Sequence, residues 1–144
     1  MTLHLRPATM DDAKILFDWR NDPLTRQHSH NSGEVPWKSH LAWLQTSLAN
    51  PARTLYIAES DGTAVGTVRA DLLEGGEYEL SWTVAPEARG RGFAKAMTRQ
   101  FVQEILPGER LLASIKKGNV ASEKIAQALG LSPGPAKDDV VTWR

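Results

Sequence analysis

The sequence predicts a single α/β domain over residues 1–144, built on one mixed, mostly antiparallel central sheet flanked by about four helices. The length is that of one ordinary domain, and neither a repeat nor a linker interrupts it. Apolar residues alternate with period two in some segments and recur every three to four residues in others. These segments follow the order strand, two helices, three strands, helix, strand, helix, strand.

The N-terminal region begins with a short strand and continues into two helices. Leu3 and Leu5 alternate with polar residues up to Pro7. Thr9 is placed to cap a helix that ends before Pro23, because the residue preceding a proline disfavours helix. After a polar loop, apolar residues at helical spacing predict a second helix: Trp37, Leu41, Leu44 and Leu48.

Three strands are expected next, over 54–60, 64–73 and 77–84. Asp61-Gly62 separates the first two and is typical of a tight hairpin turn. Gly75-Gly76 precedes the third strand. Both connections are too short for a parallel crossover, so the three strands form an antiparallel meander.

Helices and strands alternate in the C-terminal part. Phe93, Met97 and Phe101 recur every four residues and predict a helix to about residue 107. A buried strand follows over 110–115. Asn119 then caps a helix that stops at Gly130, and the chain ends in an apolar strand over 140–143.

Composition excludes several classes of function. Lys and Arg number 17, as do Asp and Glu, so a broad electrostatic grip on nucleic acid or on an anionic membrane is not expected. The chain has no cysteine, which rules out thiol nucleophiles and zinc–thiolate sites. No signal peptide or membrane span is recognisable in the sequence. We expect a cytoplasmic protein, either a monomer or a homodimer.

The segment Arg89-Gly90-Arg91-Gly92 lies between a strand and a helix. Glycines before a helix N-terminus allow the backbone to approach a ligand, and the free N–H groups there bind phosphate. A Walker A loop is absent, and Lys95 occupies the third glycine position of a dinucleotide motif. A repeated, disordered RNA-binding Arg-Gly segment would not run directly into an amphipathic helix. The segment therefore predicts a pyrophosphate cradle.

The sequence Arg89-Gly90-Arg91-Gly92-Phe93-Ala94 resembles the pyrophosphate motif of the GNAT superfamily of acetyl-CoA-dependent N-acetyltransferases. The segment "NVASEKIAQALGL" resembles the second cofactor motif of that family, and the element order is similar to the GNAT fold. The opening region, "LRPATMDDAKILFDWRNDP", is similar to GNAT enzymes that acetylate nucleotide-linked amino sugars in surface-polysaccharide biosynthesis. The tripeptide Trp19-Arg20-Asn21 also resembles branches of the GNAT superfamily that modify proteins.

The resemblance implies where acetyl-CoA binds and where the chemistry takes place. The pyrophosphate would lie on the backbone of residues 89–94, and the pantetheine arm would lie along Trp82, Thr83 and Val84. Asn119 would complete the cofactor site. The Val84 N–H is the candidate donor to the developing oxyanion. Ser122 is the nearest hydroxyl for protonating the leaving thiolate, since the position of the tyrosine in many members is Ala126.

Candidates for the general base and for the acceptor site lie in two other segments. Glu79 shares a strand face with Ser81 and Thr83 and is the candidate base, the alternative being a solvated surface carboxylate. The family implies that the segment between the first two helices borders the acceptor. Its polar residues suit a hydroxyl-rich or phosphorylated molecule: Asn21, Arg26, His28, Ser29 and Asn31.

Two pairs of residues in and after this segment are expected to have ordinary structural roles. His28 and His30 lack a convincing third ligand, so no metal site is expected. Trp37 and Trp43 are expected to pack in the core.

The sequence thus predicts an acetyl-CoA-dependent N-acetyltransferase acting on a primary amine of a small molecule, with a nucleotide-linked amino sugar as the expected acceptor. Acetylation of a protein or peptide amine is the alternative within the same class. A non-catalytic acyl-CoA-binding module is the alternative from another class, as is an RNA-binding protein. No nucleic-acid or membrane partner is expected.

Overall fold

The computed structural model describes residues 3–30 and 32–144. Seven strands form one sheet in the order β1-β2-β3-β4-β5-β7-β6, and every neighbouring pair is antiparallel except β4 and β5. The predicted mixed, mostly antiparallel sheet is therefore confirmed. The strands are β1 (His4–Pro7), β2 (Arg53–Ser60), β3 (Thr63–Leu72), β4 (Tyr78–Val84), β5 (Leu111–Lys116), β6 (Pro133–Lys137) and β7 (Val140–Trp143).

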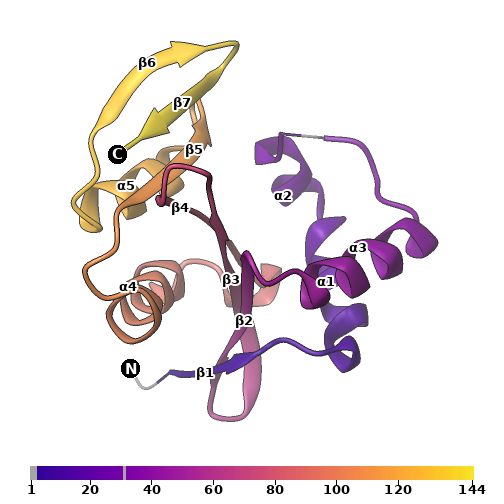
Figure 1. The fold of residues 1–144 in the computed structure, drawn as a ribbon. Helices are drawn as coiled ribbons and strands as arrows, with labels where there is room; N and C mark the ends of the chain where they lie inside the picture. Colours follow the sequence, from indigo (N-terminus) through magenta and orange to yellow (C-terminus); the bar gives the residue numbers. More distant parts are fainter. Residues whose placement is uncertain (1–2, 31) are drawn as a thin grey trace.

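Helices lie on both faces of the sheet, as Figure 1 shows. One face carries α4 and α5, and the other is flanked by α1, α2 and α3. The α-helices are α1 (Ala13–Arg20), α2 (Pro23–His28), α3 (Trp37–Ala49), α4 (Phe93–Ile105) and α5 (Val120–Ala128). Two 3-10 turns, Met10–Asp12 and Pro86–Ala88, precede α1 and follow β4.

Local sequence signals account for several boundaries. The Thr9 side chain accepts a hydrogen bond from the Asp11 N–H, and the Asp12 carboxylate accepts one from the Thr9 N–H, so Thr9 caps this region as expected. Asp61 and Gly62 both have positive φ, at 51° and 78°, as a two-residue hairpin turn requires. The Asn119 side chain accepts from the Ser122 N–H and caps α5.

Two elements depart from the sequence prediction. The expected loop after Pro23 begins with α2, whose first turn contains that proline and whose N-terminus is capped by Asp22. A seventh strand, β6, lies at the edge of the sheet and contains Pro133 and Pro135. An edge position tolerates proline, because one side of the strand has no partner that needs its N–H groups.

The main core lies between the sheet and the helices. Ile57 and Val68 of the sheet are fully buried, as are Leu44 of α3 and Met97 and Phe101 of α4. These side chains belong to one continuous hydrophobic cluster. The tertiary packing therefore fixes the helices on both faces of the same central strands.

One tryptophan prediction was wrong. Trp37 remains 41% exposed, with its ring edge-on to Phe17, so it is not a core residue. Trp43 is partly buried against the main core, and its remaining surface faces the cleft described below.

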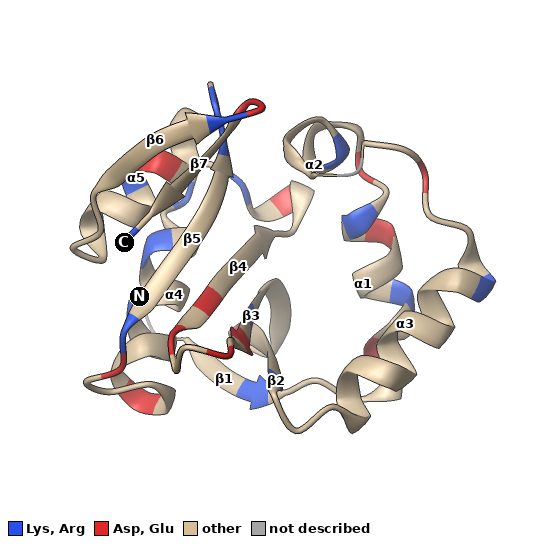
Figure 2. Cartoon of the chain, turned by 45° about the horizontal axis from the view of Figure 1, so that its top comes forward, with Lys and Arg blue, Asp and Glu red and all other residues tan. Residues whose placement is uncertain are grey.

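The strands β4 and β5 separate at the centre of the sheet. Their pairing consists of Tyr78 with Leu111 and Glu79 with Leu112. Beyond that point β5 pairs with β7, and the two parallel strands diverge (Figure 2). The divergence leaves one edge of β4 without a partner strand over its C-terminal half.

Candidate active site

A cleft of about 720 Å³ occupies the gap between β4 and β5. Leu80–Val84 of β4 form one wall and Ala113–Lys116 of β5 form the other. The N-terminal ends of α4 and α5 and residues of α1, α2, α3, β2 and β3 complete it. The predicted pantetheine residues Trp82, Thr83 and Val84 all line this cleft.

The backbone of β4 presents hydrogen-bonding groups to the cleft. The Ala85 N–H donates to the Val65 carbonyl, 2.8 Å away across the β3–β4 pair. Because N–H groups of successive residues in a strand point to opposite edges, the Val84 N–H points away from β3 and toward the gap. The same alternation turns the Trp82 N–H toward β5, consistent with the Tyr78 N–H, which donates to the Arg110 carbonyl. A bound extended chain can therefore pair with β4 here.

The glycine segment forms a loop at the start of α4. Gly90 and Gly92 have φ values of 76° and 80°, a region that glycine adopts without strain. The first backbone bond within α4 is the one from the Ala96 N–H to the Gly92 carbonyl. The N–H groups of Phe93, Ala94 and Lys95 consequently have no partner within the helix, and no side chain caps this end. The loop and helix end have the geometry of an anion cradle.

The two arginines of this loop do not point into the cradle. The Arg89 guanidinium binds the carboxylate of Asp22 and lies 3.1 Å from the Thr25 hydroxyl. Arg91 stacks on the ring of Phe93, with its Cζ 4.7 Å from the centroid. The cradle is thus made of backbone groups, and Arg89 connects the loop to α2.

Asp22 is held ionised by this contact. Burial opposes its ionisation, but the hydrogen bonds from Arg89 and from the Thr25 N–H outweigh burial and lower the pKa of Asp22. On the other side of α2, the Lys116 ammonium donates to the Gln27 carbonyl at 3.2 Å. Arg89 of the glycine segment and Lys116 of β5 therefore both hold α2 beside the cleft.

The N-terminal end of α5 borders the cleft through Asn119 and Ser122. The Asn119 amide oxygen is used as the helix cap, so its contribution to a ligand would come from its remaining groups. Ala126 is fully buried. The two tyrosines of the chain, Tyr56 and Tyr78, are absent from the residues that line the cleft.

The candidate base Glu79 lies beside the cleft and is absent from its lining. Its carboxylate accepts a hydrogen bond of 2.8 Å from the Ser114 hydroxyl, and Ser114 does line the cleft. The register places Glu79 opposite Asp71, and Ser81 opposite Arg69. Arg69 contacts the Trp43 ring of α3, so these residues lie on the sheet face that α3 covers. Proton transfer to Glu79 would therefore pass through Ser114 or a water molecule.

Only some of the predicted acceptor residues line the cleft. His28 and Ser29 line the cleft, and so does His30. Asn21 instead uses its amide to bind both the N–H and the carbonyl of Val35, and it holds the following loop. Arg26 lies 4.0 Å from Glu34 and is also outside the cleft lining. Asn31 lies outside the described residues.

Sequence reasoning did not assign four basic residues of the cleft lining to the site: Arg20, Arg69, Lys95 and Lys116. The lining contains no aspartate or glutamate among the described residues, whereas its basic members are Arg20, Arg69, Arg89, Lys95 and Lys116. Arg69 carries a recognisable signal, because the face Thr67–Arg69–Asp71 of β3 is polar in the centre of a sheet. A chain with equal numbers of acidic and basic residues thus concentrates positive charge in its main cleft.

No group of three or more His, Cys, Asp or Glu side chains in residues 3–30 and 32–144 is arranged to hold a metal ion. None of the helices in those ranges has the length and apolarity needed to cross a membrane.

Comparison with known families assigns the chain to a class. The family model described as an acetyltransferase (GNAT) domain matches residues 2–132. The chain therefore belongs to the GNAT acetyltransferase family, as the resemblance of its glycine segment and of its second cofactor motif implied. Among curated protein sequences, none is a significant match.

Solved structures share the fold. A ribosomal-protein-alanine N-acetyltransferase from Brucella melitensis is 23% identical with a TM-score of 0.80, and 97% of each chain is covered. A protein from Salmonella typhimurium, solved with its cofactor acetyl-CoA, is 19% identical with a TM-score of 0.77, covering 99% of this chain and 92% of its own. A spermidine N-acetyltransferase from Vibrio cholerae, in complex with CoA and spermine, is 14% identical with a TM-score of 0.83, covering 99% and 92%.

Proposed function

We propose that this protein transfers the acetyl group of acetyl-CoA to a primary amine of a small molecule. The observation that carries this proposal is the cleft itself, where an uncapped helix N-terminus and a glycine loop meet an unpaired strand edge. Coenzyme A combines a pyrophosphate with an extended pantetheine arm, so it matches both features. The Salmonella and Vibrio proteins, solved with acetyl-CoA and CoA, support the same cofactor here.

In this arrangement the pyrophosphate binds the backbone N–H groups of residues 90–95, and the pantetheine pairs with β4 along Trp82 and Val84. The amine nitrogen attacks the thioester carbonyl carbon, and the Val84 N–H donates to the oxyanion that forms. The C–S bond then breaks and releases the coenzyme thiolate. Holding both substrates in one cleft supplies a further large part of the rate enhancement.

Two protons move in this reaction. The amine loses one, which we assign to Glu79 through Ser114 or a bound water, since the Ser114 hydroxyl already contacts that carboxylate. The thiolate gains one, and Ser122 at the start of α5 is the hydroxyl that we assign to this step, with water as the alternative donor. No tyrosine lines the cleft, so the proposed proton donor to the thiolate is an aliphatic hydroxyl or water instead of a phenol.

A nucleotide-linked amino sugar is the acceptor that we favour. His28 and Ser29 bring polar groups to the cleft beside α2, and the basic lining suits a phosphorylated molecule. The names of the Brucella and Vibrio proteins suggest two other acceptors to test, an N-terminal alanine and a polyamine.

The proposal is tested by incubating the protein with acetyl-CoA and a panel of amines. The panel contains a uridine-diphosphate amino sugar, glucosamine, spermidine and a peptide that begins with alanine. We expect amine-dependent release of free thiol, together with an acetylated product by mass spectrometry. Acetyl-CoA binding without amine-dependent thiol release would contradict the proposal and favour an acyl-CoA-binding module.

A further inference from the structure

Two arginines from distant parts of the chain meet at one tryptophan ring in the cleft. Arg20 is the last residue of α1, and Arg69 lies in the middle of β3. Their Cζ atoms lie 4.6 Å and 6.0 Å from the centroid of the Trp43 ring, and all three residues line the cleft. Arg20 and Arg69 are called the arginine pair below.

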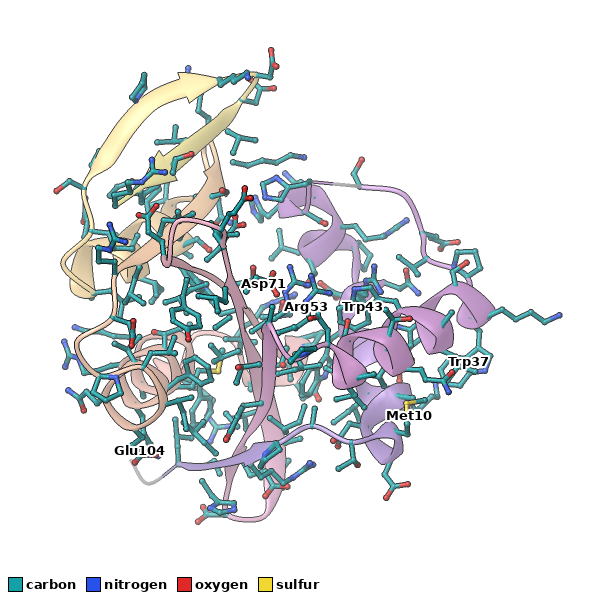
Figure 3. All side chains as sticks on the ribbon, in the orientation of Figure 1. Met10, Trp37, Trp43, Arg53, Asp71 and Glu104 are labelled. Carbon is teal, nitrogen blue, oxygen red and sulfur yellow. The ribbon has the colours of Figure 1, made fainter. Side chains whose placement is uncertain are left out.

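The surroundings of the arginine pair contain fewer negative than positive charges. Arg53 binds Asp71 with an Nε–Oδ1 distance of 2.6 Å, and the Arg69 Nε lies 3.3 Å from the other oxygen of the same carboxylate. Arg69 and Arg53 therefore share Asp71, and Figure 3 shows Asp71 beside Arg53. Glu79 adds a more distant attraction to Arg69.

Arg20 has no carboxylate within 4.0 Å in residues 3–30 and 32–144. Its Nη1 lies 3.4 Å from Nδ1 of His40, a buried ring whose Nε2 lies 2.8 Å from the Ala13 carbonyl. Because a carbonyl only accepts, Nε2 carries the proton and Nδ1 is left to accept from Arg20. Most of the Arg20 donors remain free of protein acceptors.

Burial makes this arrangement costly for the free protein. Loss of solvent lowers the pKa of Arg20, and the nearby charge of Arg69 lowers it further. Burial also lowers the pKa of Arg69, with Arg53 adding to the effect and Asp71 opposing it. The buried Nε of Arg69 is not aligned for a hydrogen bond with Asp71. Guanidinium groups stay charged even so, and an anion bound between them would offset the repulsion.

The arginine pair lies on the acceptor side of the cleft. Arg69 is opposite Ser81, three residues or about 10 Å along the strand from Val84. The glycine loop lies beyond Val84, at the other end of this path. The phosphates of the coenzyme at that loop are therefore served by different groups.

We propose that Arg20 and Arg69 form a subsite that binds an anionic oxygen group, a carboxylate or a phosphate, on the amine acceptor. The inference rests on the proposed function and narrows its substrate class to amines that also carry a negative charge. Guanidinium groups bind both anions through paired N–H donors. The subsite disfavours a polycation such as spermidine, because its charges would meet Arg20, which has no carboxylate partner, and Arg69, which shares Asp71 with Arg53.

The test compares matched amines that differ in this group. Glucosamine 6-phosphate is paired with glucosamine, and 6-aminohexanoate with hexylamine, so that the two pairs distinguish phosphate from carboxylate. We expect kcat/KM of the wild-type protein to favour the anionic member of one pair at least tenfold. Arg20→Gln and Arg69→Gln should each reduce that preference by roughly 10- to 100-fold, the effect of losing a charge-assisted hydrogen bond.

Arg99→Gln is the matched control, since Arg99 is exposed on α4 and outside the cleft lining. It should leave the preference unchanged. Acetyl-CoA affinity, measured by calorimetry, should stay within about threefold in both cleft variants, which shows that they are folded. Preference for the uncharged amine, or a preference that survives both substitutions, would overturn the subsite while leaving acetyl transfer intact.

A binding measurement separates the two proposals if no amine is acetylated. Glucosamine 6-phosphate and 6-aminohexanoate are titrated into the protein saturated with coenzyme A. Binding of either that is lost in Arg20→Gln but kept in Arg99→Gln would support the subsite although the proposed function had failed. If the wild-type protein binds neither, the subsite is overturned.

Discussion

At the scale of single residues, the carboxylate assigned to proton transfer lies behind the cleft wall. Glu79 and Glu77 are neighbours in this region, but only Glu79 contacts a residue that lines the cleft, through Ser114. Glu77 is bound by the Arg144 guanidinium at 3.2 Å. Glu79 and Glu77 therefore allow the carboxylate that we assign to proton transfer to be compared with one that is held in an ion pair.

Glu79→Gln should lower kcat by on the order of a hundredfold, because general-base assistance is typically worth 10²–10⁴-fold. Acetyl-CoA affinity should change little, since the side chain is distant from the glycine loop. Turnover of the variant should rise with pH as the amine itself loses its proton. Steady-state kinetics from pH 6 to 9, with Glu77→Gln as the control, measures both effects. A loss below about threefold with an unchanged pH profile would assign Glu79 a structural role.

His40 is expected to make stability depend on pH. It is fully buried, and burial lowers its pKa from the ordinary value of 6.5 despite the hydrogen bond to Ala13. At a pH between the pKa of His40 in the folded chain and its higher pKa in the unfolded chain, the unfolded chain binds a proton that the folded chain does not. Stability contributed by neutral His40 is therefore complete above about pH 6.5 and is lost as the pH falls below it.

Urea unfolding at pH 7.5, 6.5 and 5.5 measures this dependence, whose slope for one proton cannot exceed about 1.4 kcal/mol per pH unit. His40→Gln keeps an amide that can donate to the Ala13 carbonyl and does not titrate. We expect its unfolding free energy to vary less over this range. Equal pH dependence in the two proteins would exclude His40 as the source.

Sequence reasoning was most successful for residues whose role is local. Asn119 was predicted to cap a helix from its position alone, and it does so. The meeting of Arg20 and Arg69 was not predicted, because it depends on how α1 packs against α3 and on where Trp43 of α3 lies relative to β3. Glu79 illustrates both outcomes. The strand face on which it lies was predicted correctly from the alternation of side chains. Its distance from the cleft was not predicted, because that distance depends on how far β5 diverges from β4.

At the scale of secondary-structure elements, the split between β4 and β5 and the glycine loop determine the site. Alternating hydrophobicity was enough to place β2, β3 and β4, and helical spacing was enough for α3 and α4. The short helix α2 was missed because its six residues carry no apolar repeat and none of them is buried. The strand β6 was missed because all its residues are exposed and it forms only by pairing with β7.

Gly92→Val tests the loop as a phosphate site. A β-branched residue at φ 80° strains the backbone and places a side chain where the pyrophosphate meets α4. Gly108→Val is a matched control, because Gly108 has φ 74° and open space where a Cβ would project, but is absent from the cleft lining. Both variants should lose stability in thermal unfolding, while only Gly92→Val should lose acetyl-CoA binding by calorimetry. Equal affinities in the two variants would exclude the loop as the phosphate site.

At the scale of the whole molecule, charge is separated between the surface and the cleft. The formal net charge is zero, yet the described cleft lining contains arginines and lysines and no carboxylate. Overall composition gave no reason to expect a polyanion-binding surface, and it could not reveal a local excess of positive charge. Arg20 and Arg69 place part of that excess at the proposed anion subsite, away from the glycine loop that we assign to the coenzyme phosphates.

The most direct test of this account is a calorimetric titration of acetyl-CoA into the purified protein. The account predicts a single saturable site and a matching rise in the thermal midpoint. At 100 times the dissociation constant, the ligand should stabilise the fold by about 2.7 kcal/mol if it binds only the native state. Absence of both heat and thermal shift at millimolar acetyl-CoA would contradict the assignment of the cleft as its binding site.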